Sequence, residues 1–257
     1  LQEACHEALW TCCHPVKEKI PADILLLGGD DIIVYLAADT AIPFAIELAK
    51  RFESKTKDRI GRDPFFANLL QGRGLTISLG IAYGRSHTPI AILVDQAEEL
   101  LKSAKQKGTA MAPSEFYAPA CIDFHLASRY NQLHVKDSRS QHLVLKTANG
   151  TLLNLYGGPY TVEEAENLQS QAVRLRKSDL PRSWLHRFGE APFQGYWLGN
   201  IETLIVWGRA RTDEDRKVLY EVLDALGCLP HPPWRETEST VDTPIVDLVS
   251  LTEWTNG

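Results

Sequence analysis

The sequence predicts an α+β protein, with helices and strands mixed in its first half and helices dominating its second half. Two apolar runs, Asp23 to Leu27 and Ile32 to Leu36, are joined by a Gly-Gly turn and predict a β-hairpin. A helical pattern precedes the hairpin, and a helix, a strand, a helix and a strand follow it. This order matches the split β-α-β-β-α-β arrangement of ferredoxin-like folds, with one added strand at the end, if a first strand lies before Leu1.

Apolar residues at helical spacing predict the helices of the first half. Residues 2–18 carry a loose pattern that ends at a proline. Residues 39–53 carry a stronger one, with Asp39 as a good N-cap. Residues 89–107 form the clearest helix, and we expect Gly108 to stop it.

The strands are predicted by runs of apolar residues. Both strands of the hairpin are apolar on successive residues, which favours a central position in a sheet that helices cover on at least one face. Leu75 to Tyr83 and Cys121 to Ala127 are predicted as the next two strands.

The second half begins where the sequence becomes polar, with only short apolar runs. Thr161 and Glu164 form a capping box that starts a helix, and a later helix runs from about Glu214 to Leu226, stopped by Gly227. We expect three parts: a first domain at 1–128, a connecting region at 129–158 and a helical C-terminal domain at 159–257.

Composition and charge narrow the function classes. The chain has 257 residues, of which 44% are hydrophobic and 23% charged, as in ordinary globular proteins. A net charge of -6 argues against a protein that holds nucleic acid by bulk charge. Small anionic substrates such as nucleoside triphosphates would need metal ions and a few placed Lys or Arg side chains.

The remaining features favour a cytoplasmic protein. The five cysteines are an odd count without a disulfide spacing, which indicates a reducing compartment. No stretch is long enough for a membrane span, and no signal segment opens the chain. The chain begins at Leu1 inside a predicted helix, so we infer that something upstream is missing.

The adjacent aspartates Asp30 and Asp31 are the strongest candidates for chemistry. Nucleotidyl transfer uses two Mg²⁺ ions, which prefer carboxylate oxygens as ligands. The preceding Gly28 and Gly29 let the backbone turn sharply and leave space for a triphosphate. The alternative is an ordinary hairpin turn, in which aspartate serves local hydrogen bonding.

With this turn, the sequence resembles the palm domain of the large catalytic subunit of type III CRISPR effector complexes. The matching stretches are LLLGGDDIIVYLAADTA at 25–41, LTISLGIAYGRSHTPIAILVDQAEELLKSAKQKG at 75–108 and CIDFHLAS at 121–128. They cover about the first half of the chain, and GGDD in its hairpin is the most specific of them.

The resemblance implies an activity and its residues. A palm of this family converts ATP to cyclic oligoadenylate in antiviral defence, and Asp30 and Asp31 would bind its catalytic Mg²⁺ or Mn²⁺. Gly28 and Gly29 would shape the turn, and Lys105 resembles the lysine that meets the triphosphate in related cyclases. The alternative for Lys105 is a favourable charge near a helix C-terminus. The implied partners are other effector subunits with guide and target RNA, and no membrane.

Several departures keep alternatives open. The family's first strand supplies a further metal ligand and would lie before Leu1, and the adjacent His-Asp pair of the family's nuclease domain is absent from this sequence. A catalytically inactive palm that serves as a structural module is therefore one alternative. A diguanylate-cyclase-like enzyme is another, although Asp31 and Ile32 replace the expected Glu and Phe after the Gly-Gly-Asp/Glu turn.

Other candidate residues favour structural interpretations. Cys5, Cys12 and Cys13 lack the spacing of a zinc site and are predicted to pack in a core. Asp123 and His125 share one side of a strand, as an acid–base pair or, more simply, as a hydrogen-bonded pair at the sheet edge.

The second half carries a basic stretch and a set of tryptophans. The basic residues could hold RNA or a partner, although a solvated helix face is the default: Arg174, Arg176, Lys177, Arg182 and Arg187. The tryptophans are predicted to build the helical core: Trp197, Trp207, Trp234 and Trp254.

Overall fold

The structure, a computed structural model, forms two compact units. It describes residues 1–13, 22–112, 117–126, 134–236 and 240–254. The first unit comprises Leu1–Gln132 and Pro159–Glu166, and the second comprises Leu133–Gly158 and Asn167–Gly257. The α+β class is confirmed, with a mixed region followed by a largely helical part, whereas the domain boundaries stay a prediction. No helix in the described ranges is both long and apolar enough to cross a membrane.

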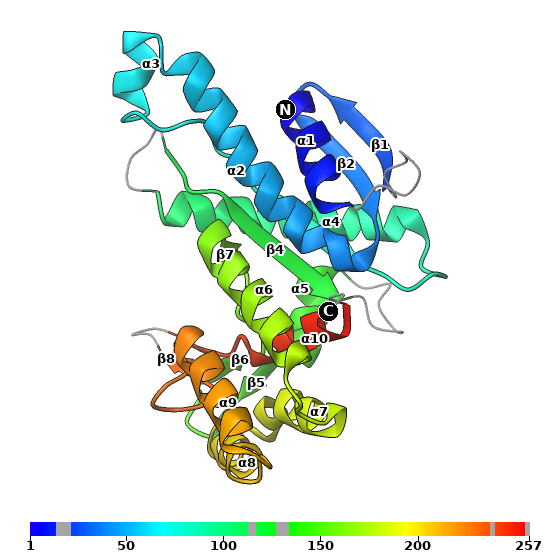
Figure 1. The fold of residues 1–257 in the computed structure, drawn as a ribbon, viewed down its shortest axis with the longest axis vertical. Coiled ribbons are helices and arrows are strands. Elements are labelled where there is room, and N and C mark those ends of the chain that lie inside the picture. The colour runs from blue at the N-terminus through cyan, green and yellow to red at the C-terminus, as the bar shows by residue number, and fades with distance from the viewer. Residues whose placement is uncertain (14–21, 113–116, 127–133, 237–239, 255–257) are drawn as a thin grey trace. The chain divides into compact units, whose positions relative to one another are not determined.

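The first unit contains the predicted elements in the predicted order, with a short helix, a 3-10 turn and a two-residue strand added (Figure 1). The part of the predicted helix 2–18 that follows Cys13 lies outside the described residues. The elements are α1 (Gln2–Cys12), β1 (Ala22–Gly28), β2 (Asp31–Leu36), α2 (Ala41–Ile60), α3 (Pro64–Leu69), β3 (Leu79–Tyr83), α4 (Ile90–Ala110), β4 (Cys121–Leu126) and β7 (Tyr160–Thr161).

The β1–β2 hairpin is a two-stranded antiparallel sheet with one covered face. Helices α1 and α2 lie on that face (Figure 1). Leu27 and Ile32 pack there against the buried Phe44 and Leu48. On β1, Leu26 remains exposed. The predicted central position was wrong, because among the described residues each hairpin strand pairs only with the other.

The second sheet of this unit has the order β3-β4-β7, and α4 packs against it. β3 and β4 are parallel, whereas β4 and β7 are antiparallel. Gly108 lies inside α4, where an added Cβ would come within 2.7 Å of the Pro119 carbonyl oxygen. The prediction that Gly108 stops the helix was therefore wrong, because this glycine permits close packing and the helix continues to Ala110.

The start of α2 also differs from its prediction. Asp39 lies in a 3-10 turn, Ala38–Thr40, and Thr40 is the N-cap instead. The backbone N–H and the hydroxyl of Thr40 both donate to the Ala37 carbonyl oxygen, at 3.1 and 2.8 Å. Asp39 therefore lies inside the 3-10 turn, one residue before the N-cap of α2.

The second unit is built from helices around a small mixed sheet of order β5-β6-β9-β8. Leu153, Leu155 and Trp234 form the buried centre of this core. The elements are α5 (Val135–His142), β5 (Val144–Lys146), β6 (Leu152–Asn154), α6 (Val162–Lys177), α7 (Arg182–Glu190), α8 (Tyr196–Gly208), α9 (Asp213–Ala225), β8 (Arg235–Glu236), β9 (Val241–Asp242) and α10 (Ile245–Trp254); α6 begins in the first unit.

Local signals for two helices in this half are confirmed. The Thr161 backbone N–H donates to Glu164 Oε2 at 2.8 Å, and the Glu164 N–H donates to Thr161 Oγ1 at 3.2 Å, as in a capping box. α9 ends before Gly227, whose φ of 71° suits a glycine after a helix.

The tryptophans do not form one core. Trp234 is 1% exposed, but Trp197 is 76% exposed and Trp207 is also exposed. The prediction was wrong for these two because both lie on outward sides of α8, and the side chain of Trp254 lies outside what the structure describes.

Candidate functional site

The candidate site is the turn that joins β1 to β2. Gly28 and Asp31 form the last pair of the hairpin ladder. Gly29 has a φ of 61°, and Asp30 is not among the residues with positive φ. A left-handed glycine at the first central position is the pattern of a type II′ turn, whose twist suits a tight hairpin. The Gly-Gly-Asp-Asp sequence therefore folds locally as its residue types predict.

The two carboxylates lie at the exposed tip of this hairpin. Asp30 and Asp31 are both exposed, and neither makes an ion pair with another described residue. Ile32 packs toward α1 and α2, so the alternation of a strand directs its neighbour Asp31 to the open face. Gly28 stands directly opposite Asp31 and therefore lies on the same face.

The space in front of the turn is open. A Cβ added to Gly28 or to Gly29 would meet no atom within 4 Å. Gly29 needs its glycine for the positive φ, but Gly28 has an ordinary strand conformation. Neither backbone strain nor packing thus explains the glycine at position 28.

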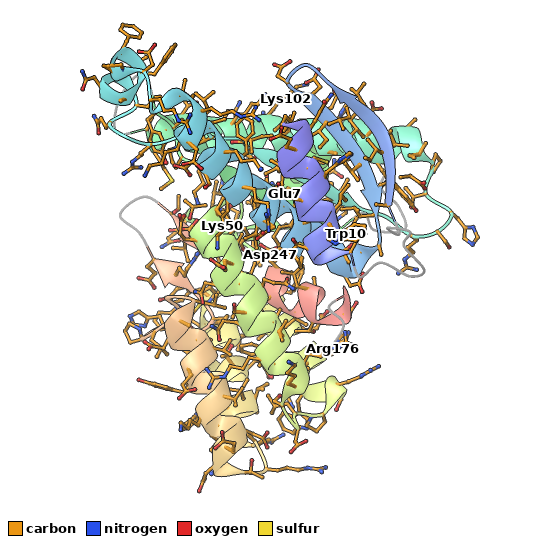
Figure 2. All side chains as sticks on the ribbon, turned by 45° about the horizontal axis from the view of Figure 1, so that its top comes forward. Glu7, Trp10, Lys50, Lys102, Arg176 and Asp247 are labelled. Carbon is orange, nitrogen blue, oxygen red and sulfur yellow. The ribbon has the colours of Figure 1, made fainter. Side chains whose placement is uncertain are left out.

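Lys105 lies on α4, one turn after Lys102, which Figure 2 labels. Its side chain is exposed, and no hydrogen bond or ion pair joins it to the Asp30–Asp31 turn in the part of the chain that the structure describes. The helix dipole favours a cation most in the last turn of a helix. Because α4 continues to Ala110, Lys105 lies before that turn. The alternative of a helix C-terminal charge is thereby weakened.

Lys107, two residues further on, has a structural role instead. Its ammonium group donates to the Pro159 carbonyl oxygen at 2.5 Å and forms an ion pair with Glu164 at 2.8 Å. These contacts tie α4 to the start of α6 within the first unit.

The donor set at the turn fits a hard divalent cation. Mg²⁺ is commonly held by one or two carboxylates, with waters and substrate phosphates completing its shell. Asp30 and Asp31 offer two exposed carboxylates beside open space. No group of three or more His, Cys, Asp or Glu side chains suited to a metal occurs among the described residues. The turn therefore fits a cation that substrate helps to hold.

Asp123 and His125 are core residues rather than a surface pair. Both are buried on β4, which is the central strand of its sheet, and both have interactions within the structure. On the side away from β3, β7 pairs only with Cys121 and Ile122, so beside Asp123 and His125 no described strand pairs with this side of β4, as a sheet-edge position requires.

The N-terminal cysteines pack as predicted. Cys5 and Cys13 are buried in the core between α1 and α2, and Cys12 is partly buried beside it. Burial raises the pKa of the Cys12 thiol to about 11, which keeps it protonated at neutral pH.

Much of the basic stretch is engaged within the second unit. Arg174 pairs with Glu221, and Arg187 pairs with Glu202. Arg176, labelled in Figure 2, donates to the Thr252 carbonyl oxygen at 3.3 Å. These contacts favour the structural interpretation over an RNA-binding one.

The sequence did not predict which hairpin residues share the open face with Asp31. Leu26 and Tyr35 are exposed there, and Ile33 is partly buried. No signal could have separated them from the covered face, because the two strands are apolar on successive residues.

Comparison with known protein families gives one finding at this site. Residues 15–112 match the family described as Cas10/Cmr2, second palm domain, and this range contains the turn and Lys105. The comparison with curated proteins gave no match to the chain.

Proposed function

We propose, on the premise that residues 15–112 are a second palm domain of the Cas10/Cmr2 family, that this chain is part of a nucleotidyltransferase that makes cyclic oligoadenylate from ATP. Its setting would be the cytoplasm, in an antiviral type III CRISPR complex with other effector subunits, guide RNA and target RNA. The reaction joins the 3′ oxygen of one nucleotide to the α-phosphorus of another, releases pyrophosphate and loses the hydroxyl proton to solvent.

The glycine at position 28 is the observation that carries the proposal. Glycine in a strand costs about 0.5–1 kcal/mol relative to alanine. Gly28 needs neither a positive φ nor room for a neighbour within the chain, since nothing lies within 4 Å of an added Cβ. A triphosphate that approaches the Asp31 side of the hairpin would use that space.

Each residue of the turn has a separate role in this proposal. Asp30 and Asp31 present carboxylate oxygens to Mg²⁺ or Mn²⁺, and Gly29 provides the backbone bend that brings the two carboxylates to the tip. When bound, the metal stabilises charge on the phosphate oxygens. Lys105 supplies a cation for the phosphate tail, since it is exposed and no ion pair with a described residue occupies it.

The second candidate is a palm that has lost catalysis and serves as a structural module of the complex. The small number of possible metal ligands favours this inactive palm. Among the described residues the turn offers two carboxylates, and no cluster of three possible ligands occurs. A diguanylate-cyclase-like enzyme would use the same turn with GTP.

The test incubates the full-length protein, assembled with its guide-RNA complex and target RNA, with labelled ATP or GTP and Mg²⁺ or Mn²⁺. Wild type is compared with an Asp30→Asn/Asp31→Asn variant, which keeps the side-chain shape but removes the charge. Binding of Mn²⁺ in the presence of ATP, followed by electron paramagnetic resonance, gives a readout that does not require turnover.

Asp58→Asn is the matched control, because Asp58 is an exposed aspartate on α2 away from the turn. We expect wild type to make oligoadenylate and to bind Mn²⁺. The Asp30→Asn/Asp31→Asn variant should lose both properties, and the Asp58→Asn control should retain them. Products from GTP alone would support the diguanylate-cyclase alternative. Retained structure with neither product nor Mn²⁺ binding would leave the structural module as the function.

A further inference from the structure

Helix α8 carries an apolar stripe on the side that faces away from its own core. We name it the α8 stripe, and it consists of Trp197, Leu198, Ile201, Leu204 and Gly208. Trp197 is 76% exposed, and the leucines and the isoleucine are each more than half exposed. The opposite side of the helix holds the buried Gly199, Thr203 and Val206. A helix that is apolar on both sides is normally covered on both sides.

The exposed area of the α8 stripe is large enough for a protein–protein contact. With the exposed Trp207 on the same helix and Phe193 in the 3-10 turn that precedes it, the stripe presents an apolar area on the order of 600 Å², given the size of aromatic side chains. This is at the upper end of apolar patches on monomers and approaches the ~800 Å² that each partner buries in a standard interface.

No charge interrupts the stripe. Glu202 is the charged residue of α8, and its carboxylate is held by Arg187 at 2.7 Å. A charged partner surface would therefore have no opposite charge to pair with along the stripe. An uncharged apolar helix would match it.

We propose that the α8 stripe pairs with the same stripe of a second copy of this chain, antiparallel and about a two-fold axis. Trp197 and Gly208 are equally far from the point between Glu202 and Thr203, near the middle of the helix, and so are Ile201 and Leu204. A two-fold axis through that point places Trp197 against Gly208 of the partner subunit, and Ile201 against Leu204 of the partner subunit. The stripe is therefore its own complement, with its largest side chain facing its smallest residue and two similar aliphatic side chains between them.

Gly208 gives this register independent support. A Cβ added at Gly208 would meet nothing within 4 Å, and its φ is not in the left-handed region. Neither packing within the unit nor backbone conformation thus requires glycine there. Open space above this residue is what the indole of Trp197 from a second copy would fill.

The test measures the dimer dissociation constant of the 257-residue chain by sedimentation equilibrium over a wide range of concentration. We expect a reversible dimer with a Kd on the order of micromolar. Trp197→Ala should raise the Kd about 30-fold or more, as for an aromatic hot-spot residue of an interface. Gly208→Trp should raise it as well, because two large rings would then face each other.

The double variant Trp197→Gly/Gly208→Trp tests the register. It exchanges the large and the small residue, so it should recover most of the dimer that each single change loses. Tyr220→Ala is the control, since Tyr220 is an exposed aromatic residue on α9 outside the stripe. Circular dichroism checks that every variant is folded.

Three results would overturn the inference. A chain that is monomeric at every concentration has no such interface. A dimer that Trp197→Ala leaves intact uses another surface. A double variant no tighter than the single variants contradicts the antiparallel register.

Discussion

Gly28→Ala and Gly29→Ala should change stability in opposite directions although the two glycines are neighbours. At Gly28 the new Cβ meets nothing within 4 Å and φ is ordinary, so the loss of glycine's unfolded-state entropy should stabilise the fold by about 0.5–1 kcal/mol. At Gly29 the φ of 61° forces alanine into the left-handed region, at a cost of about 1–2 kcal/mol. The midpoint of thermal unfolding should rise by about 2 °C for the first variant and fall by about 4 °C for the second.

Activity should separate function from stability at the same positions. The methyl group of Gly28→Ala projects onto the face that carries Asp31, so it should lower ATP turnover on the order of 100-fold in spite of the higher stability. Gly150→Ala is the matched control for Gly29, because Gly150 also has a positive φ, of 89°, and open space around it. It should lose stability but keep turnover.

Urea denaturation and the labelled-ATP assay are run on the same preparations. If Gly28→Ala lowers the free energy of unfolding by more than about 1 kcal/mol, the space in front of the turn is not open as described. If that variant is stable and fully active, the triphosphate does not approach Gly28, and the role assigned to this glycine is refuted.

Three further outcomes follow from other contacts. Gly108→Ala should cost about 1–3 kcal/mol in urea denaturation, instead of the gain usual for this change in a helix, because its Cβ would lie 2.7 Å from the Pro119 carbonyl oxygen; an unchanged midpoint would contradict the close packing. Thr161→Ala should cost about 1 kcal/mol through the lost capping box with Glu164, and Glu163→Gln, a change in the same turn outside the box, serves as control. Burial raises the pKa of Cys228 from 9.0 to about 12, so this thiol should leave the free energy of unfolding unchanged below pH 9 and lower it as pH rises toward 12, because the unfolded chain ionises first. Cys228→Ala should abolish that part of the decline in urea denaturation followed against pH, and an identical decline in both proteins would exclude the thiol as its source.

Features encoded by neighbouring residues could be predicted from the sequence. The turn at Gly29 depends on residues within four positions of each other, and so does the capping box of Thr161 and Glu164, and both folded as expected. The position of Lys105 on α4 follows from helical spacing in the same way.

Features that depend on distant parts of the chain could not be predicted. Gly108 looks like a helix stop because glycine often ends helices, and only the approach of the Pro119 backbone reveals its packing role. Trp197 on α8 is exposed, whereas Trp234, which precedes β8, is buried, so residue type does not decide burial. For Trp197, periodicity shows that a helix has a face but not which face is covered.

The orientation of the candidate site depends on a β-bulge that no residue type in β1 indicates. Ile24 pairs with Val34, but Leu26 pairs with Ile33, so Leu25 is an extra residue in the strand. This bulge shifts the alternation of β1, and it is what allows Gly28 to stand opposite Asp31 with a two-residue turn between them.

Without the bulge, the ladder from Ile24 and Val34 would continue in step, and Leu27 would meet Asp31. A leucine would then occupy the open position beside the carboxylate, and the turn would lengthen to three residues. Since four consecutive apolar residues, Ile24 to Leu27, carry no alternation, the sequence is compatible with either register. The bulge at Leu25 therefore determines that the glycine, and not a bulky side chain, faces the place where a triphosphate would bind.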